Sequence, residues 1–168
     1  MDFGAQLLSL AAQLRHAGIT PEIIAEYGSR RHPVLPWRRV PHFRVLAECW
    51  RLGSFLLTPA GELWWSENSV RAARRERLGV VSDAQEARRD VAGWAFKSGI
   101  AERTQVNYHA VPLQNFLSTP ETQPSPTPAL VYAAGEVKVL WHASATVDQA
   151  PPLIHYLTER CELLLLRG

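Results

Sequence analysis

The sequence predicts a protein of the α+β class, with an antiparallel sheet made of two hairpins and a middle strand and with helices packed on one face. Apolar residues recur at helical spacing in several segments. Two pairs of short apolar runs each flank a turn sequence. The length of 168 residues is close to that of one domain. We therefore expect a single domain over 1–168, with a proline-rich connector at 119–128.

The N-terminal segment predicts an amphipathic helix. Its apolar residues are three or four positions apart, namely Phe3, Leu7, Leu10 and Leu14. Asp2 is placed to cap the start of this helix and Gly18 to end it. The sequence Thr20-Pro21-Glu22 has the pattern of a second helix start, so a short second helix is expected before Gly28.

The next segment predicts a loop followed by strands. Prolines interrupt 29–41, which we interpret as an extended surface loop. A strand is expected over 43–50 and a hairpin over 54–66, because 58–61 reads Thr-Pro-Ala-Gly, a turn sequence. The basic stretch 69–77 is expected to be a loop or a single turn.

A helix is predicted to begin at Ser82 and to run to about Ser98. Ser82-Asp83-Ala84-Gln85 matches the capping box. The helix would bury one apolar stripe, which consists of Ala84, Ala87, Val91, Trp94 and Ala95. Gly99 is expected to stop it.

The C-terminal part predicts a strand, a connector, a hairpin and a helix. Polar and apolar residues alternate over 105–111, and β-branched and aromatic residues occur there, which indicates a strand. Four prolines within 119–128 indicate a mobile or polyproline-like connector. A second hairpin is expected over 130–141, and helical spacing continues from Leu153 to Leu165. The alternative is a helix that ends near Arg160 and a buried strand through the leucine run.

Composition excludes several classes of protein. Hydrophobic residues make up 46% of the chain, so it can bury a core, and its formal net charge of +2 does not by itself imply a nucleic-acid or membrane partner. No apolar run is long enough to cross a membrane, and the first twenty residues do not form a signal peptide. We therefore expect a cytoplasmic protein.

Cys49 and Cys161 are expected to be buried thiols, and the six histidines show no metal-ligand spacing. We expect no cofactor.

Arginines form the densest charge in the chain over a short stretch. The cluster consists of Arg71, Arg74, Arg75 and Arg77. Such a cluster can contact nucleic-acid phosphates or an acidic partner. The alternative is a solvated surface whose arginines are partly ion-paired with nearby acidic residues, because exposed charges contribute little to stability.

Trp64 and Trp65 are adjacent on an expected strand, so their side chains project to opposite faces. If one lies in the core, the other needs cover from the chain itself or from a second subunit. Aromatic residues are enriched in the cores of protein interfaces. The pair is therefore a candidate homodimer contact, with cover from the same chain as the alternative.

Cys49, Asn107 and His109 are the candidate catalytic residues. Asn107 and His109 would share one face of a strand, and Cys49 would supply a thiol. Neither cysteine has the glycine-flanked setting of a nucleophile elbow, and the sequence contains no G-x-S-x-G. It also contains no H-E-x-x-H, phosphate-binding loop or dinucleotide-binding motif.

Three stretches carry a resemblance to a known family. They are 52–57 (LGSFLL), the expected helix with Arg88 and Arg89, and 106–113 (VNYHAVPL). On these stretches, about the middle half of the chain, the sequence resembles a small uncharacterised bacterial family whose members are sometimes labelled glutaminase. The resemblance implies hydrolysis of an amide, and it assigns no residue a role.

We expect a non-catalytic cytoplasmic protein that acts through protein contacts, as a homodimer or with another protein. The alternatives are a small glutaminase-like amide hydrolase and a nucleic-acid-binding protein that uses the Arg71–Arg77 cluster. The hydrolase requires its candidate residues to converge in one pocket. The nucleic-acid binder requires a contiguous basic face, and the interaction protein requires an exposed apolar patch.

Overall fold

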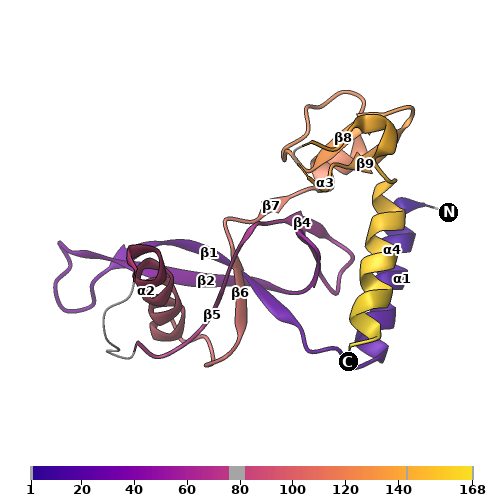
Figure 1. Cartoon of the computed structure of the whole chain (residues 1–168). Helices are drawn as coiled ribbons and strands as arrows, with labels where there is room; N and C mark the ends of the chain where they lie inside the picture. The colour runs from indigo at the N-terminus through magenta and orange to yellow at the C-terminus, as the bar shows by residue number, and fades with distance from the viewer. Residues whose placement is uncertain (1, 76–81, 143, 168) are drawn as a thin grey trace. The chain divides into compact units, whose positions relative to one another are not determined.

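The computed structural model describes residues 2–75, 82–142 and 144–167 (Figure 1). Helices and strands within these ranges confirm the α+β class. The chain divides into two compact units, each described by itself below. Unit one comprises Met1–Pro21, Cys49–Trp65 and Val111–Gly168, and unit two comprises Glu22–Glu48 and Ser66–Ala110. No described helix has the length and apolar character that crossing a bilayer requires.

Unit one contains three α-helices, a 3-10 turn and most of the short strands. In chain order they are α1 (Phe3–His16), β3 (Phe55–Leu57), β4 (Leu63–Trp65), β7 (Val111–Pro112), α3 (Gln114–Ser118), β8 (Leu130–Ala133), β9 (Glu136–Val139), η1 (Val147–Gln149) and α4 (Leu153–Leu165). Unit two contains β1 (Glu22–Arg31), β5 (Asn68–Arg71), α2 (Asp83–Lys97) and β6 (Gln105–Tyr108). The long strand β2 (Arg39–Leu52) contributes to both units.

The two terminal helices of unit one follow the sequence prediction. Leu7, Leu10 and Leu14 of α1 are buried, and α1 ends before Gly18, whose φ of 68° suits a residue without a side chain. In α4, Leu153, Leu157 and Cys161 are buried at intervals of four residues. The alternative of a strand through the terminal leucines is wrong. Both helices pack into one apolar core.

The strands of unit one form two separate sheets. The end of β2 pairs with β3, β3 with β4 and β4 with β7, all antiparallel. The turn between β3 and β4 is closed by a hydrogen bond of 3.0 Å from the Gly61 amide to the Thr58 carbonyl. Strands β8 and β9 form a two-stranded sheet of their own, although the sequence analysis placed both hairpins in one sheet.

The proline-rich segment 119–128 ends on a buried side chain. Thr127 is 4% exposed, its Oγ1 accepts a hydrogen bond from the Ala129 amide at 3.1 Å, and Ser125 Oγ donates to its carbonyl at 2.7 Å. Residues 121–124, by contrast, are all exposed.

We expect limited proteolysis to make its first internal cuts at 121–124, because that stretch is exposed and lacks strand hydrogen bonds. Mass spectrometry of the first fragments measures this. First cuts within α1 or α4 would contradict the prediction.

Unit two is built on a strand that the sequence analysis took for a helix. Thr20-Pro21-Glu22 is followed by β1, which pairs in parallel with β6 through Ile23 and Val106. Ile24 and Ala25, adjacent in the chain, are both buried. Because both faces of this strand are buried, pairing in the sheet outweighs the helix-start pattern of Thr20-Pro21-Glu22. The parallel pair also makes the sheet mixed rather than antiparallel.

Neighbouring segments of unit two differ from prediction in similar ways. The stretch expected as a surface loop, 29–41, contains the end of β1 and the start of β2. The stretch 69–77 contributes to β5, which pairs antiparallel with β6. The expected strand 105–111 is divided into β6 and β7, because His109 has a φ of 52° and leaves the extended conformation.

Helix α2 confirms the predicted boundaries, but its buried face is rotated. Ala92, Gly93 and Ala95 are buried, whereas Ala87 is exposed. Trp94 is only half-buried, with Lys97 Nζ 4.5 Å from its ring centroid. Ser82 occupies the N-cap position without a side-chain hydrogen bond, so the expected capping box does not form.

Candidate nucleic-acid interface

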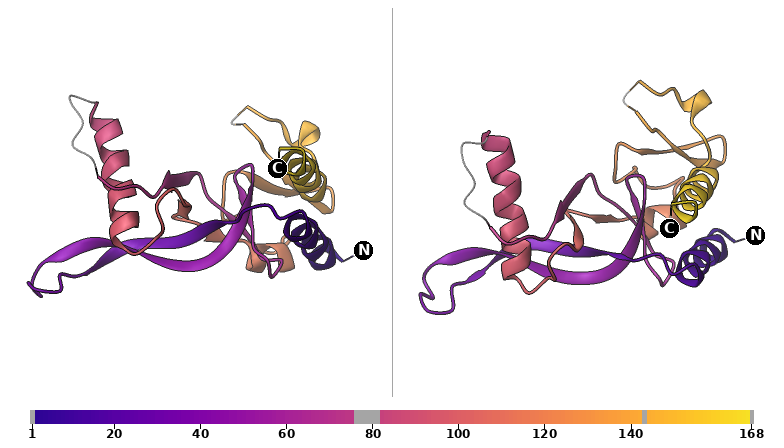
Figure 2. Two further views of the ribbon diagram at one scale, coloured as in Figure 1. Left: turned by 90° about the horizontal axis from the view of Figure 1, so that it is seen from below. Right: turned by 60° about the horizontal axis from the view of Figure 1, so that its bottom comes forward.

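The end of the β1–β2 hairpin, residues 28–44, is a basic arm. It contains five arginines and two histidines and no Asp or Glu. Strands β1 and β2 are hydrogen-bonded neighbours, so the arm is a two-stranded ribbon. Figure 2 shows that this ribbon extends beyond α2 within unit two. The arm therefore concentrates positive charge on a projecting element.

The tip of the arm, residues 32–38, is held in one shape by hydrogen bonds. The His32 amide donates to the Arg38 carbonyl at 2.8 Å, and the Arg38 amide donates to the Leu35 carbonyl at 2.8 Å. His32 Nδ1 accepts hydrogen bonds from the Val34 and Leu35 amides at 3.2 and 3.1 Å. Two prolines within the tip further restrict its backbone. The tip is thus ordered before any partner binds.

Large apolar side chains on this tip face the solvent. Trp37 is 77% exposed and Val34 is 76% exposed. This exposure leaves most of the Trp37 indole ring in water, which is unfavourable for an apolar surface. An exposed tryptophan on a rigid, basic tip is suited to contact a flat apolar surface on an anionic partner.

The arginines of the arm divide into two groups. Arg39 donates to Ser29 Oγ at 2.9 Å and to the Ser29 carbonyl at 3.1 Å, and Arg44 pairs with Glu26 at 2.6 Å. Arg30, Arg31 and Arg38 are exposed and form no ion pair within the described part of the chain. Three guanidinium groups of the arm therefore remain available to an external anion.

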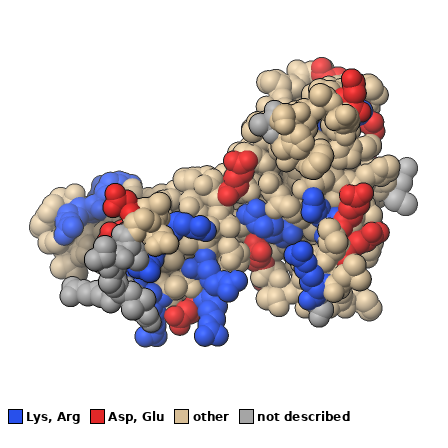
Figure 3. All heavy atoms as spheres, in the orientation of Figure 1, with Lys and Arg blue, Asp and Glu red and all other residues tan. Residues whose placement is uncertain are grey.

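The charge of the whole chain hides an uneven distribution between the units. Unit two contains thirteen Lys and Arg against nine Asp and Glu, a formal charge of +4, whereas unit one contains five against seven, a charge of −2. On the face shown in Figure 3, blue side chains gather over the region of α2, β5 and the arm. The near-neutral total is thus a poor guide to the electrostatics of unit two.

His42 lies on the arm in β2, and its protonation is opposed by its surroundings. Burial lowers the pKa of His42, and the neighbouring Arg30 guanidinium lowers it further. His42 therefore favours its neutral form in the free protein. An anion that neutralises Arg30 would raise the pKa of His42 again.

The arginine cluster that the sequence analysis singled out is largely engaged within unit two. Arg75 pairs with Asp90 at 3.0 Å and with Glu86 at 3.6 Å, and the Arg74 guanidinium lies 5.2 Å from the centroid of the Phe96 ring. Arg71 is exposed at the end of β5. Arg77 lies outside the described residues.

Trp64 and Trp65 are both half-buried on β4 in unit one. Trp65 packs against the unit-one core. Within the described residues, both indole N–H groups are buried without a hydrogen-bond partner. The homodimer contact through these residues stays a prediction.

The candidate catalytic residues have three different environments. Cys49 is fully buried in unit one, whereas Asn107 and His109 belong to unit two. The side-chain amide nitrogen of Asn107 (Nδ2) donates to Glu22 Oε2 at 2.8 Å and to the Ile23 carbonyl at 3.2 Å. His109 is exposed and lies outside β6, so alternation along a strand no longer places it on the face of Asn107. A hydrolase site formed by the three residues stays a prediction.

Sequence reasoning missed the arm because it interpreted 29–41 as a loop and weighed charge mainly by local density. Along the sequence, residues 32–37 separate Arg30 and Arg31 from Arg38 and Arg39, and only strand pairing makes the two pairs neighbours. A signal was present, because residues 28–44 contain five arginines and no acidic residue.

Comparison with known proteins adds no assignment to these features: the chain matches no family model, no curated protein and no solved structure.

Proposed function

We propose that this chain is a non-catalytic nucleic-acid-binding protein and that the basic arm is its binding element. The observation that carries the proposal is a combination of features on the arm. Three exposed arginines without an ion pair to a described residue belong to the same hairpin end as a tip tryptophan that is 77% exposed. The same tip is ordered by its own hydrogen bonds.

Each part of this combination matches the chemistry of a nucleic acid. Guanidinium groups bind phosphate oxygens through two parallel hydrogen bonds, and the backbone presents phosphates at regular intervals. A two-stranded ribbon fits the major groove of a duplex. Trp37 can stack on an unpaired base or enter between base pairs. An acidic protein would use the arginines but offers no regular series of flat apolar surfaces to Trp37.

The test compares two variants that lose the same charge from unit two. The arm variant replaces Arg30, Arg31 and Arg38 by glutamine. The control replaces three arginines outside the arm that form no ion pair with a described residue, namely Arg88, Arg89 and Arg103. Binding to a fluorescein-labelled DNA duplex and to the same single strand is measured by anisotropy, and circular dichroism checks that both variants fold.

We expect the arm variant to lose affinity about 100-fold, because three exposed charged contacts contribute about 1 kcal/mol each. The control should lose less than about fivefold, which a change in net charge alone can cause. Equal losses in the two variants would assign the binding to net charge and would overturn the proposal. An absence of binding by the wild type to either DNA would also overturn it.

The proposal also predicts a pH dependence. Phosphates bound next to Arg30 should raise the pKa of His42, so that complex formation takes up a proton. Affinity should then increase as the pH falls through the ordinary titration range of histidine. His42→Gln should reduce this increase, because glutamine cannot take up the proton. Anisotropy titrations at several pH values, at constant ionic strength, measure the difference. Identical pH profiles for the two proteins would exclude His42 as the responsible group.

A further inference from the structure

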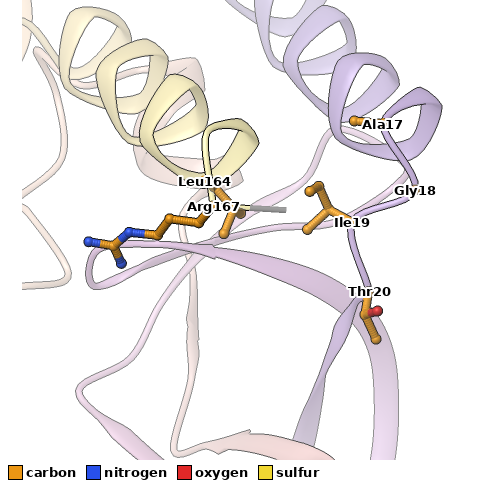
Figure 4. A pocket seen from close by; sticks show the side chains of 6 residues that line it. All are labelled: Ala17, Gly18, Ile19, Thr20, Leu164 and Arg167. Carbon is orange, nitrogen blue, oxygen red and sulfur yellow. The ribbon is translucent and has the colours of Figure 1, made fainter.

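The pocket of unit one in Figure 4 does not point to one class of ligand. It is lined by six residues, namely Ala17, Gly18, Ile19, Thr20, Leu164 and Arg167. Polar and apolar groups contribute about equally to this lining, and the Arg167 guanidinium points away from Ile19 and Thr20. A strand edge in unit two is more informative.

Strand β2 forms an edge of the unit-two sheet over residues 44–48, the β2 edge. The strands of unit two follow the order β5-β6-β1-β2, so β1 occupies one side of β2. The neighbour of β2 on its other side is β3, which pairs with Trp50, Arg51 and Leu52. On that side no strand of the described part of the chain is paired with 44–48. Such an edge can pair with a further strand.

Backbone groups of β2 point alternately to β1 and to the open side. The His32 amide donates to the Arg38 carbonyl, so the even-numbered residues of β2 form hydrogen-bonded pairs with β1 and the odd-numbered residues do not. The Phe43 amide agrees with this alternation, because it donates to Ser98 Oγ, at the end of α2, at 2.9 Å. The odd-numbered residues of the β2 edge therefore present their N–H and C=O groups outward.

The side chains of the β2 edge combine exposed apolar groups with one charge of each sign. Val45 is 52% exposed and Leu46 is 42% exposed. Arg44 binds Glu26 through Nε and one terminal nitrogen, and its remaining N–H groups can bind a second carboxylate. Glu48 is exposed and forms no ion pair with a described residue. Arg44, Leu46 and Glu48 share one face of the strand.

We propose that the β2 edge binds the same edge of a second copy of this chain, in antiparallel orientation. The sequence of the edge is complementary to itself about Leu46. With Leu46 opposite its own copy, Arg44 of each chain lies opposite Glu48 of the other chain, and Val45 lies opposite Ala47. Val45 and Ala47 then exchange backbone hydrogen bonds across the contact, because both present these groups outward.

The charges favour this register over the neighbouring ones. A register centred on Val45 would place Arg44 opposite Leu46, and one centred on Ala47 would place Glu48 opposite Leu46. The register centred on Leu46 instead forms two pairs of opposite charge and covers the exposed apolar side chains with one another. A second copy therefore satisfies the backbone groups, the charges and the apolar side chains of the edge together.

The test is sedimentation velocity of the full chain over a range of concentrations. We expect a weak dimer with a dissociation constant on the order of 100 μM, because a contact of about five residues per chain is small for a protein interface. The sedimentation coefficient should therefore increase between about 10 μM and about 1 mM protein. A coefficient that stays at the monomer value over this whole range would overturn the proposal.

Charge variants locate the contact. Glu48→Arg should weaken the dimer about tenfold, because it places two arginines opposite each other in both pairs. Glu102→Arg is the matched control, because Glu102 is also an exposed glutamate of unit two without an ion pair to a described residue, but it lies in the turn before β6. Arg44→Glu combined with Glu48→Arg restores the opposite charges and should restore association. Equal weakening by Glu48→Arg and Glu102→Arg would overturn the proposed contact.

Ala47→Pro tests the backbone pairing. Proline removes the outward N–H group of residue 47 and leaves the hydrogen bonds to β1 in place, so the dimer should weaken while circular dichroism shows an intact fold. An unchanged dimer in this variant would overturn the strand pairing. Dissociation by Trp64→Ala but not by Glu48→Arg would place the contact in unit one and would also overturn it. DNA binding by dilute, monomeric protein should be unchanged in Ala47→Pro, so this proposal and the function of the arm can fail separately.

Discussion

Replacing Phe43 by alanine should lower the free energy of unfolding by about 3–5 kcal/mol, the usual cost of truncating a buried aromatic side chain. Phe43 is 2% exposed, stacks on Tyr27 with ring centroids 4.6 Å apart, and lies 5.8 Å from the centroid of the Tyr108 ring. Its removal leaves a void in the core of unit two. Urea denaturation followed by circular dichroism measures the loss.

Trp94→Ala is the informative comparison. The sequence stripe placed Trp94 in the core, but its ring is half-buried and is partly covered by Lys97. We therefore expect its replacement to cost about 1–2 kcal/mol, because less apolar surface is lost from the interior. A Trp94 variant less stable than the Phe43 variant would contradict the rotated face of α2.

Gly53→Ala should destabilise unit one by about 2–4 kcal/mol, for two physical reasons. Its φ of 71° is costly for a residue with a side chain, and a Cβ atom there would overlap the Tyr156 hydroxyl. Tyr156 packs edge-on against Phe55 at 5.8 Å, so its displacement would disturb the core.

Gly135→Ala separates the two reasons. Gly135 also belongs to unit one and has a φ of 81°, but a Cβ atom there would meet nothing within 4 Å. We expect it to cost only the backbone strain, about 1 kcal/mol. Denaturation midpoints of the two variants give the comparison, and equal losses would show that Tyr156 does not restrict residue 53.

The sequence predicted elements whose formation depends on near neighbours. Helix α1 shows its buried stripe and its terminal Gly18 in the sequence, and the turn at Gly61 closes strands only a few residues apart. Strand β1 could not be found in this way, because its parallel partner Val106 lies far along the chain from Ile23. The proline after Thr20 matches the pattern of a helix start, so the sequence favoured a helix where the structure has strand β1.

The candidate interface depended on the same distant pairing. Once β1 and β2 are recognised as a hairpin, Arg31 and Arg38 come to opposite sides of one turn, and that turn also contains Trp37. Charge density along the chain pointed instead to the cluster that contains Arg75, whose ion pairs with α2 become visible only in three dimensions.

The dependence of DNA affinity on salt concentration tests the role of the arm most directly. Binding to phosphates releases counterions, so the logarithm of the association constant falls with the logarithm of the salt concentration by about 0.9 for each phosphate contacted on a duplex. For the wild type we expect a slope of about −3 or steeper. Replacement of Arg30, Arg31 and Arg38 by glutamine should make the slope about 2–3 units shallower. A slope that is unchanged by this replacement would show that the arm does not contact the phosphates and would contradict the account.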